Sequence, residues 1–364
     1  MRIADLDTPA LVIDLDIMER NLCRAAQYAS SHGLRLRPHT KTHKIPALGR
    51  RQVELGAAGL TVAKVSEAEV MLGSGTPDML IAYPVIGAAK LARLMEVARK
   101  TAVTVALDSL VAARCLSEAA QAAQIAVGVL AEADVGLGRV GVNPGAELIA
   151  LARGIEGLPN LKLEGVAFYP GHIKRLDDEG FRDLEVLAGL VEKTLGELRA
   201  AGIVPGIVSG GSTPALFQSH RIPGLNEIRP GTYIFNDKNT VLSNACTYDD
   251  CAASILTTVV STARPHQIII DGGSKTFSSD RLSPVQEVSF GTIVQAPGAV
   301  FTRMNEEHGY VDIEKADRKF AIGDRLNVIP NHICTAVNLH EKVYGVRGDC
   351  VEQIWAVEGR GKLQ

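Results

Sequence analysis

Two different spacings of apolar positions alternate along the first two thirds of the chain. Short β-branched or apolar runs, typical of buried strands, are each followed by a longer stretch with the apolar spacing of a helix. Within residues 177–201, for example, Leu184, Leu187, Val191 and Leu195 follow the helical spacing. The strand-like runs are Ala10–Ile13, Leu34–Pro38, Gly59–Ala63, Met79–Tyr83, Val103–Leu107, Ile125–Ala131, Leu163–Phe168, Val204–Val208 and Glu227–Arg229. Strands that alternate with helices in this way predict parallel βαβ units.

The number of these units predicts a (β/α)8 TIM barrel of the α/β class. Eight βα units over about 200–250 residues are the size of such a barrel, whereas a doubly wound open sheet, the alternative, usually has fewer units. The chain offers one strand more than a barrel holds. The surplus strand is most simply the first, Ala10–Ile13, which need not belong to the barrel.

The pattern changes after about residue 240, where helical spacings become rare and strand-like runs dominate. Turn signals such as Asp271-Gly272-Gly273 and Arg347-Gly348-Asp349 separate these runs. The runs are Ile255–Val260, Ile268–Asp271, Gly291–Gln295, Val311–Ile313, Arg325–Ile329, Val343–Val346 and Gln353–Val357. We therefore expect a barrel over residues 16–240 and an antiparallel β domain over residues 241–364.

The composition is that of an ordinary globular protein and argues against several classes of partner. Hydrophobic residues make up 46% and charged residues 22% of the 364 residues, and the formal net charge is -3. Without a basic surplus or a basic block, the sequence predicts no nucleic-acid partner. It also lacks an apolar run of the length that a membrane span needs, so we expect no membrane partner.

The start of the chain and the cysteines predict a cytoplasmic protein. An export signal needs an unbroken apolar core, and four aspartates interrupt the corresponding region, at Asp5, Asp7, Asp14 and Asp16. The six cysteines are scattered over the chain without a CxxC pair, which indicates reduced thiols.

The first segment with candidate chemistry follows the strand-like run Leu34–Pro38. It carries two lysines, Lys41 and Lys44, and two histidines, His39 and His43. A barrel strand presents its functional residues at its C-terminal end. A lysine there needs its ammonium paired, deprotonated or covalently used, and desolvation with nearby cations suits a Schiff-base lysine. The alternative is a solvated basic loop.

The second segment is a glycine-rich loop after the last or penultimate barrel strand. Backbone N–H groups and hydroxyls of Ser209, Gly210, Gly211, Ser212 and Thr213 are the donors that a phosphate needs. A second Gly-Thr turn follows at Gly231, Thr232 and Tyr233. Barrel enzymes often hold a phosphate in loops at this position. Combined with the lysine after the earlier strand, this loop points to pyridoxal 5'-phosphate as cofactor.

Two further segments complete the candidate chemistry. The loop Gly136–Gly141 lacks the glycine spacing of a dinucleotide fingerprint but can place Arg139 at the barrel mouth, with a surface ion pair as the alternative. In the β domain, His332 and Cys334 are two apart. On a strand they would share one face, and an imidazole with a thiolate makes half of a zinc site. The alternative is that both are core residues.

Taken together, these segments resemble the D-threonine aldolase / D-serine dehydratase family, fold-type III pyridoxal phosphate enzymes related to alanine racemase. The resemblance rests on Asp7–Val12, the Arg-Pro-His-x-Lys-x-His-Lys motif at residues 37–44, the loops Gly136–Gly141 and Ser209–Thr213, and His332–Cys334. It implies that Lys41 carries the cofactor and that Arg139 faces the pyridine nitrogen. It also implies that the N-terminal strand, within residues 1–15, joins the β domain, and that a homodimer builds the site from both chains.

The resemblance implies a lyase that acts on a β-hydroxy-D-amino acid with the help of a divalent metal, zinc or manganese. His332 and Cys334 are the implied metal ligands, and Tyr169 matches the active-site tyrosine of the family. His172, displaced in the loop Tyr169-Pro170-Gly171-His172, is a candidate base. His308, in a hairpin-like turn, is implied to approach the site of the partner subunit.

We expect retro-aldol cleavage of the D-threonine aldolase type, which gives glycine and an aldehyde. The alternative is β-elimination, as in D-serine dehydratase or on 3-hydroxy-D-aspartate, which gives a 2-oxo acid and ammonia. Cys334 matches the dehydratases, whereas the aldolases of the family carry an aspartate at this position. Two further alternatives are an amino-acid racemase, which needs no metal, and a non-catalytic pyridoxal phosphate-binding protein, which lacks a β domain.

Overall fold

A computed structural model describes residues 1–282 and 288–364 of the chain. The chain forms two compact units. The barrel unit consists of Cys23–Lys41, Pro46–Gly231 and Gly361–Gln364. The β unit consists of Met1–Leu22, Thr42–Ile45 and Thr232–Arg360. The chain thus passes between the units several times, whereas the sequence pattern has one change, near residue 240.

Eight parallel strands form the barrel unit, in the spatial order β2-β9-β8-β7-β6-β5-β4-β3. The two outer strands of this order meet through a parallel bridge between His39 and Thr61, which closes the sheet on itself. The TIM barrel expected from the sequence is therefore confirmed. The strands are β2 (Arg35–Leu36), β3 (Leu60–Val62), β4 (Asp78–Ile81), β5 (Ala102–Leu107), β6 (Val127–Ala133), β7 (Leu161–Phe168), β8 (Ile207–Gly210) and β9 (Glu227–Ile228).

One layer of the barrel interior is apolar, and the next layer is charged. The apolar layer contains one buried residue from each of five adjacent strands, Leu80, Ala106, Leu130, Ala167 and Ile207. Along β6, Leu130 and Glu132 are two residues apart and so share a face of the strand. The charged layer therefore lies toward the C-terminal ends of the strands, where barrel enzymes build their sites.

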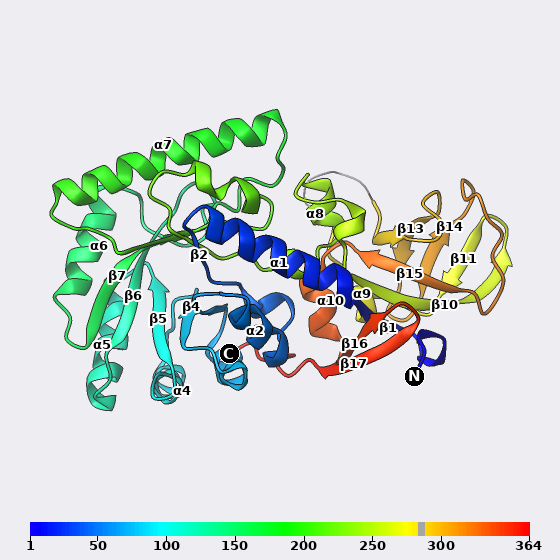
Figure 1. The fold of residues 1–364 in the computed structure, drawn as a ribbon, viewed down its shortest axis with the longest axis horizontal. Helices are drawn as coiled ribbons and strands as arrows, with labels where there is room; N and C mark the ends of the chain where they lie inside the picture. The colour runs from blue at the N-terminus through cyan, green and yellow to red at the C-terminus, as the bar shows by residue number, and fades with distance from the viewer. Residues whose placement is uncertain (283–287) are drawn as a thin grey trace. The chain divides into compact units, whose positions relative to one another are not determined.

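Helices cover the strands of the barrel unit, as Figure 1 shows for α4 to α7 beside β5 to β7. The longest, α7, begins after the N-cap Asp177, whose side chain accepts a hydrogen bond from the N–H of Gly180. The α-helices before residue 232 are α1 (Leu15–Ser31), α2 (Pro46–Glu54), α3 (Val65–Met71), α4 (Ala88–Ala98), α5 (Leu110–Ala123), α6 (Ala146–Glu156) and α7 (Asp178–Ala200). Short 3-10 helices are η1 (Ile3–Asp5), η2 (Thr40–Thr42), η3 (Leu72–Ser74) and η4 (Leu216–Arg221).

The β unit contains a closed barrel of six antiparallel strands, because β10 pairs with both β15 and β11 in the order β11-β14-β13-β12-β15-β10. Strands β1, β16 and β17 extend the same sheet. The strands are β1 (Ala10–Asp14), β10 (Ala253–Arg264), β11 (Gln267–Ile270), β12 (Gly291–Ile293), β13 (Val300–Met304), β14 (Gly309–Asp312), β15 (Arg325–Pro330), β16 (Lys342–Arg347) and β17 (Cys350–Ala356). The sequence pattern missed β13.

The N-terminal strand belongs to the β unit and not to the TIM barrel. Ala10–Ile13 pair with Ala253–Leu256 of β10 in antiparallel register, and Val12–Asp14 pair with Tyr344–Val346 of β16 in parallel register. The surplus strand of the sequence pattern therefore lies outside the TIM barrel, as expected.

Short helices connect the strands of the β unit, and one of them corrects a prediction. They are η5 (Thr232–Ile234), α8 (Lys238–Leu242), η6 (Tyr248–Asp250), α9 (Ser274–Phe277) and α10 (Ile333–Leu339). The expectation that His332 and Cys334 share a strand is wrong. Strand β15 ends at Pro330, His332 is the N-cap of α10, and Cys334 lies in its first turn. Among the described residues, no helix combines the length and the hydropathy that crossing a membrane requires.

Candidate active site

The two lysines after β2 differ in their surroundings. Lys41 lies in η2 at the C-terminal end of β2 and is exposed. Lys44 is buried, and its ammonium donates a hydrogen bond to the carbonyl of Gly359 at 3.3 Å. Within the described chain, the ammonium of Lys41 has no such partner and is therefore available for chemistry.

The histidines beside these lysines support the backbone. The His43 ring is fully buried, and its Nδ1 accepts a hydrogen bond from the N–H of Ile45 at 3.0 Å. The Nδ1 of His39 lies 3.4 Å from the N–H of Lys41. His39 and His43 thus help to fix the turn on which Lys41 stands.

The glycine-rich loop after β8 offers unused hydrogen-bond donors. Gly211, Ser212 and Thr213 are buried, and in the part of the chain that the structure describes their N–H groups donate no hydrogen bond. Buried backbone N–H groups almost always have a partner, so the loop is built to receive an acceptor. Gly211 has a φ of +89°, and a Cβ at Gly210 would lie 2.5 Å from the ring of Phe168. The loop therefore fits a phosphate group.

Ser209 has a different role from the other loop residues. It belongs to β8, and its hydroxyl donates to the Glu227 carboxylate at 2.7 Å and accepts from Arg229 at 2.6 Å. Glu227 in turn accepts a hydrogen bond from the Arg37 guanidinium at 2.9 Å. Arg37 also donates to Asp78. Ser209 is thus part of a buried charged network inside the barrel.

A buried carboxylate that the sequence analysis missed lies close to this network. Burial raises the pKa of Glu132, although the nearby charges of Arg229 and Arg139 oppose this. Burial also lowers the pKa of Arg229, a group that donates to the carbonyl of Phe168. A charge directly after the predicted strand Ile125–Ala131 was the available signal, because the C-terminal ends of barrel strands face the mouth.

Arg139, Tyr169 and His172 come together at the ends of β6 and β7. The Arg139 guanidinium lies 5.0 Å from the centre of the Tyr169 ring, in a cation–π contact. The Nδ1 of His172 is buried and has no hydrogen-bond partner among the described residues. The charge of Arg139 also acts on the buried carboxylate of Glu132.

One aspartate shapes the loop that carries Arg139. Burial acts to raise the pKa of Asp134, but hydrogen bonds from the N–H groups of Gly136, Gly138 and Leu137 outweigh it and lower the pKa. The ring of His172 lies 3.4 Å from the place of a Cβ at Gly136. A side chain at residue 136 would therefore crowd the candidate base.

His332 and Cys334 of the β unit are in contact, although they do not lie on a strand. The Cys334 sulfur and the Asp237 carboxylate raise the pKa of His332 well above its usual value, against the effect of burial. The Nδ1 of His332 lies 3.0 Å from Asp237, which is fully buried and also accepts from the N–H of Ile333. Asp237 thereby orients the His332 ring through Nδ1, so that Nε2 is the nitrogen that would bind a metal.

Hydroxyl groups flank the Cys334 sulfur. The Thr42 hydroxyl lies 3.2 Å and the Thr232 hydroxyl 3.7 Å from it. Thr42 directly follows Lys41 in the chain, and Thr232 directly follows Gly231. Tyr233, the next residue of the Gly-Thr turn, is buried.

The donor set in the β unit fits a metal through two protein ligands. No group of three or more histidine, cysteine or carboxylate side chains converges in the part of the chain that the structure describes. An imidazole and a thiol in contact, with a carboxylate behind the imidazole, form an oriented donor pair for a divalent cation. Asp237 was missed by the sequence analysis, because nothing in the sequence relates it to a histidine so far along the chain.

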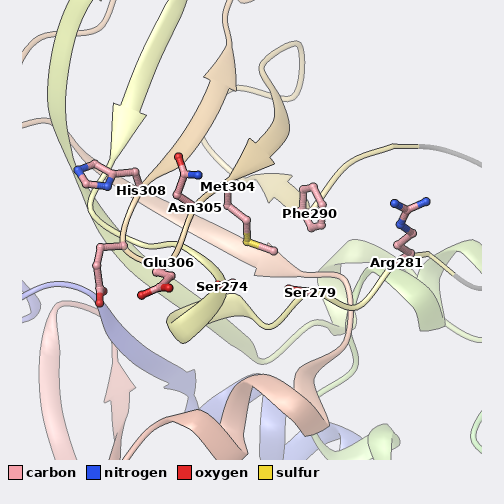
Figure 2. A pocket seen from close by; sticks show the side chains of 9 residues that line it. Ser274, Ser279, Arg281, Phe290, Met304, Asn305, Glu306 and His308 are labelled. Carbon is pink, nitrogen blue, oxygen red and sulfur yellow. The ribbon is translucent and has the colours of Figure 1, made fainter.

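A pocket of about 570 Å³ lies in the β unit beside the turn between β13 and β14. Figure 2 shows His308, Asn305 and Glu306 of this turn on one side and Phe290 and Arg281 on the other. The hairpin-like turn expected around His308 is therefore present, and the carbonyl of His308 accepts from the N–H of Asn305 at 2.9 Å.

Comparisons with known proteins agree with this arrangement. Residues 13–239 match the family model described as alanine racemase, N-terminal domain, and residues 252–346 match the putative serine dehydratase domain. The chain is 34% identical to a D-threonine aldolase from Arthrobacter sp, over 99% of this chain and 94% of that protein.

Solved structures agree as well. The crystal structure of D-threonine aldolase from Filomicrobium marinum has a TM-score of 0.93 and 32% identity, over 100% of this chain and 98% of that chain. A cysteine-to-alanine variant of D-threo-3-hydroxyaspartate dehydratase, described as the metal-free form, has a TM-score of 0.89 and 31% identity, over 98% of each chain. The chain therefore belongs to the D-threonine aldolase / D-serine dehydratase family of pyridoxal phosphate-dependent lyases with an alanine racemase-like fold.

Proposed function

We propose that the protein is a metal-assisted lyase that cleaves the Cα–Cβ bond of a β-hydroxy-D-amino acid, giving glycine and an aldehyde. The observation that carries this proposal is the Nδ1 of His172, which is buried and has no hydrogen-bond partner among the described residues, in the loop that also carries Tyr169. Retro-aldol cleavage needs a base that removes the β-hydroxyl proton. A buried imidazole nitrogen without a protein partner suits this task.

The barrel unit would hold the cofactor. Lys41 would supply the amine that holds pyridoxal phosphate through its aldehyde, and Gly211, Ser212 and Thr213 would supply N–H groups for its phosphate. When bound, the cofactor supplies an electron sink for the bond that breaks at Cα. Arg139 cannot give up its proton and would donate a hydrogen bond to the pyridine nitrogen.

His332 and Cys334 would hold the divalent metal, zinc or manganese, and Asp237 would orient His332 through its Nδ1. Such a metal would supply Lewis-acid chemistry for the β-hydroxyl group of the substrate. In the proposed reaction, His172 accepts the β-hydroxyl proton while the Cα–Cβ bond breaks. Protonation of Cα completes glycine, and the β carbon leaves as the aldehyde.

Elimination of the β-hydroxyl is the second candidate reaction. The observation in its favour is Cys334, because the resemblance associates a cysteine at this position with dehydratases. One of the relatives described as dehydratases is a cysteine-to-alanine variant in metal-free form. In this reaction Lys41 removes the Cα proton and hydroxide leaves from Cβ. The enamine that results tautomerises to an imine, and water hydrolyses this imine to a 2-oxo acid and ammonia.

The deciding experiment is product analysis with D-threonine, D-serine and D-3-hydroxyaspartate, each with a chelator and with added Zn²⁺ or Mn²⁺. We expect glycine and an aldehyde, and no reaction of the L enantiomers. His172→Asn should slow glycine formation by about a hundredfold or more.

Other products would contradict the proposal. A 2-oxo acid and ammonia without glycine would identify the eliminating reaction. Interconversion of D and L amino acids in the presence of chelator would identify a racemase. Absence of any product from a protein that has its cofactor bound would indicate a binding protein.

A further inference from the structure

Lys64 is a cation of the barrel unit that the chemistry described above does not use. It lies two residues after the end of β3, on the side of the barrel where such enzymes build their sites. Its ammonium lies 3.6 Å from the centre of the Tyr83 ring, in a cation–π contact. Tyr83 is exposed and lies two residues after the end of β4. The ammonium therefore lies at the mouth of the barrel, where β3 and β4 end.

The charge of Lys64 is not balanced by an acidic side chain. In the part of the chain that the structure describes, its ammonium contacts the Tyr83 ring and no carboxylate. The side chain is half-buried, and an aromatic ring compensates only part of the hydration that a half-buried ammonium loses. The ammonium is therefore available to an anion that enters the barrel mouth.

One buried carboxylate holds the loops of Lys64 and Lys41 together. The Glu67 side chain accepts a hydrogen bond from the N–H of Ala63, the residue before Lys64, at 2.8 Å. The Thr40 hydroxyl, one residue before Lys41, donates to the same carboxylate at 3.4 Å. The parallel bridge that closes the sheet joins the two strands just before these residues. Lys64 is thus fixed in the loop beside the lysine that would hold the cofactor.

The order of the strands separates Lys64 from the glycine-rich loop. In the closed sheet, β2 lies between β3 and β9, and β8 lies beyond β9. The loop after β8 is therefore on one side of Lys41, and Lys64 is on the other. Since that loop has its own donors for a phosphate, the anion left for Lys64 belongs to the substrate. Every amino acid carries a carboxylate at Cα, and some carry a second one at Cβ.

We propose that Lys64 binds a carboxylate of the amino-acid substrate, an inference that rests on the proposed function. Its ammonium donates charge-assisted hydrogen bonds to the carboxylate oxygens, while the Tyr83 ring keeps the ammonium in place. The carboxylate is either the one at Cα, which all substrates share, or one at Cβ, as in 3-hydroxyaspartate. Lys64 is in both cases a binding residue, and no proton or bond moves at it.

Steady-state kinetics of Lys64→Met with D-3-hydroxyaspartate and D-threonine test the proposal. KM for D-3-hydroxyaspartate should rise about 10- to 100-fold while kcat changes far less, because a hydrogen bond to a charged group is lost. An equal rise for D-threonine assigns Lys64 to the carboxylate at Cα. An unchanged KM for D-threonine assigns Lys64 to a carboxylate at Cβ. Lys64→Arg keeps the charge and should lose less affinity than Lys64→Met.

Lys162→Met is the matched control. Lys162 lies at the start of β7, at the opposite end of the barrel, and its ammonium pairs with Glu164 at 2.9 Å. The variant removes the same charge from the protein without touching the mouth. It should change neither KM.

A titration that needs no cleavage separates this proposal from the proposed function. The cofactor-loaded protein is titrated with D-aspartate and with D-2-aminobutyrate, which lack a β-hydroxyl group, and the change in cofactor absorbance gives each dissociation constant. Lys64→Met should weaken binding of D-aspartate about 10- to 100-fold. If this loss appears although no glycine forms from any substrate, the proposed function fails and the role of Lys64 stands.

Two results would overturn the proposal. The first is an unchanged KM and dissociation constant in Lys64→Met for every amino acid tested. The second is weaker binding of pyridoxal phosphate to Lys64→Met, with an unchanged KM at saturating cofactor, because Lys64 would then serve the phosphate and not the substrate.

Discussion

At the scale of single residues, side chains of the same type differ in exposure and hydrogen bonding, and these differences decide which of them is available for chemistry. Lys41 and Lys44 are three residues apart, yet one is exposed and the other is buried on the carbonyl of Gly359. Among the aspartates, Asp237 is fully buried and accepts from both the His332 ring and the backbone of Ile333. Buried charges survive only where such partners compensate for lost hydration.

Lys41→Ala should abolish the absorbance of the covalently bound cofactor and lower turnover by about a thousandfold or more, because the amine is the proposed nucleophile that holds the cofactor. Lys44→Gln is the matched control. It should keep the absorbance band, because Lys44 is committed to a structural hydrogen bond. Absorbance spectra and initial rates check both. If only Lys44→Gln lost the band, Lys44 and not Lys41 would be the residue that holds the cofactor.

Asp237→Asn should weaken metal binding by about 10- to 100-fold, because the amide no longer fixes the ring orientation and basicity of His332. Calorimetric titration with Zn²⁺ measures this. Asp280→Asn is the control, since Asp280 accepts from Thr335 in the same turn of α10 at 2.6 Å but does not touch His332. Equal affinity in both variants would contradict the role of Asp237.

At the scale of elements, the barrel strands carry buried charged side chains, and the loops after them carry hydrogen-bond donors. One buried network joins Arg37, which directly follows β2, to Glu227 of β9 and Ser209 of β8. Because Arg37 has 1% and Glu227 0% of its surface exposed, each depends on the other for the charge balance. The network thereby links strands that are neighbours in space but far apart in the chain.

Glu227→Gln should destabilise the protein by about 3–5 kcal/mol, because it removes one partner of a buried ion pair and leaves Arg37 and Arg229 under-compensated. Urea denaturation measures the change. Glu69→Gln removes an exposed partner of Arg93 and should leave the midpoint nearly unchanged. Similar midpoints for the two variants would contradict a structural role of the buried pair.

At the scale of the whole molecule, the chain builds each unit from separated segments. The β unit takes its first strand from the N-terminus, and β1 pairs with β10 and β16. Arg325 of β15 holds the same N-terminal segment by donating to the carbonyls of Ile3 and Ala4, both at 3.1 Å. Removal of the N-terminal residues would therefore disturb the β unit more than the TIM barrel.

The family resemblance implies a homodimer. The chain has a mass of 38.7 kDa, and we expect a particle with about twice this mass. Light scattering after size-exclusion chromatography measures this mass. If both chains build the site, specific activity should fall on dilution below the dissociation constant of the dimer. A monomeric mass at every concentration, with constant activity, would contradict this expectation.

The sequence alone determined much of the architecture, because local periodicity decides which segments are strands and helices. It predicted the eight barrel strands, the separate N-terminal strand, and the candidate chemistry at Lys41 and the loop after β8. It missed β13, most of whose residues are not buried. It also placed His332 and Cys334 on a strand, although Pro330 ends β15 just before them.

Only the tertiary structure decided which of the candidate groups have partners. Asp237 orients His332, and Ser209 belongs to a buried network. The N–H groups of Gly211, Ser212 and Thr213 have no acceptor among residues 1–282 and 288–364. All three findings depend on how distant segments pack. Sequence periodicity carries no information about such contacts, because they follow from how strands and loops pack in three dimensions. Burial and hydrogen bonding, which set the reactivity of each side chain, are properties of the folded chain.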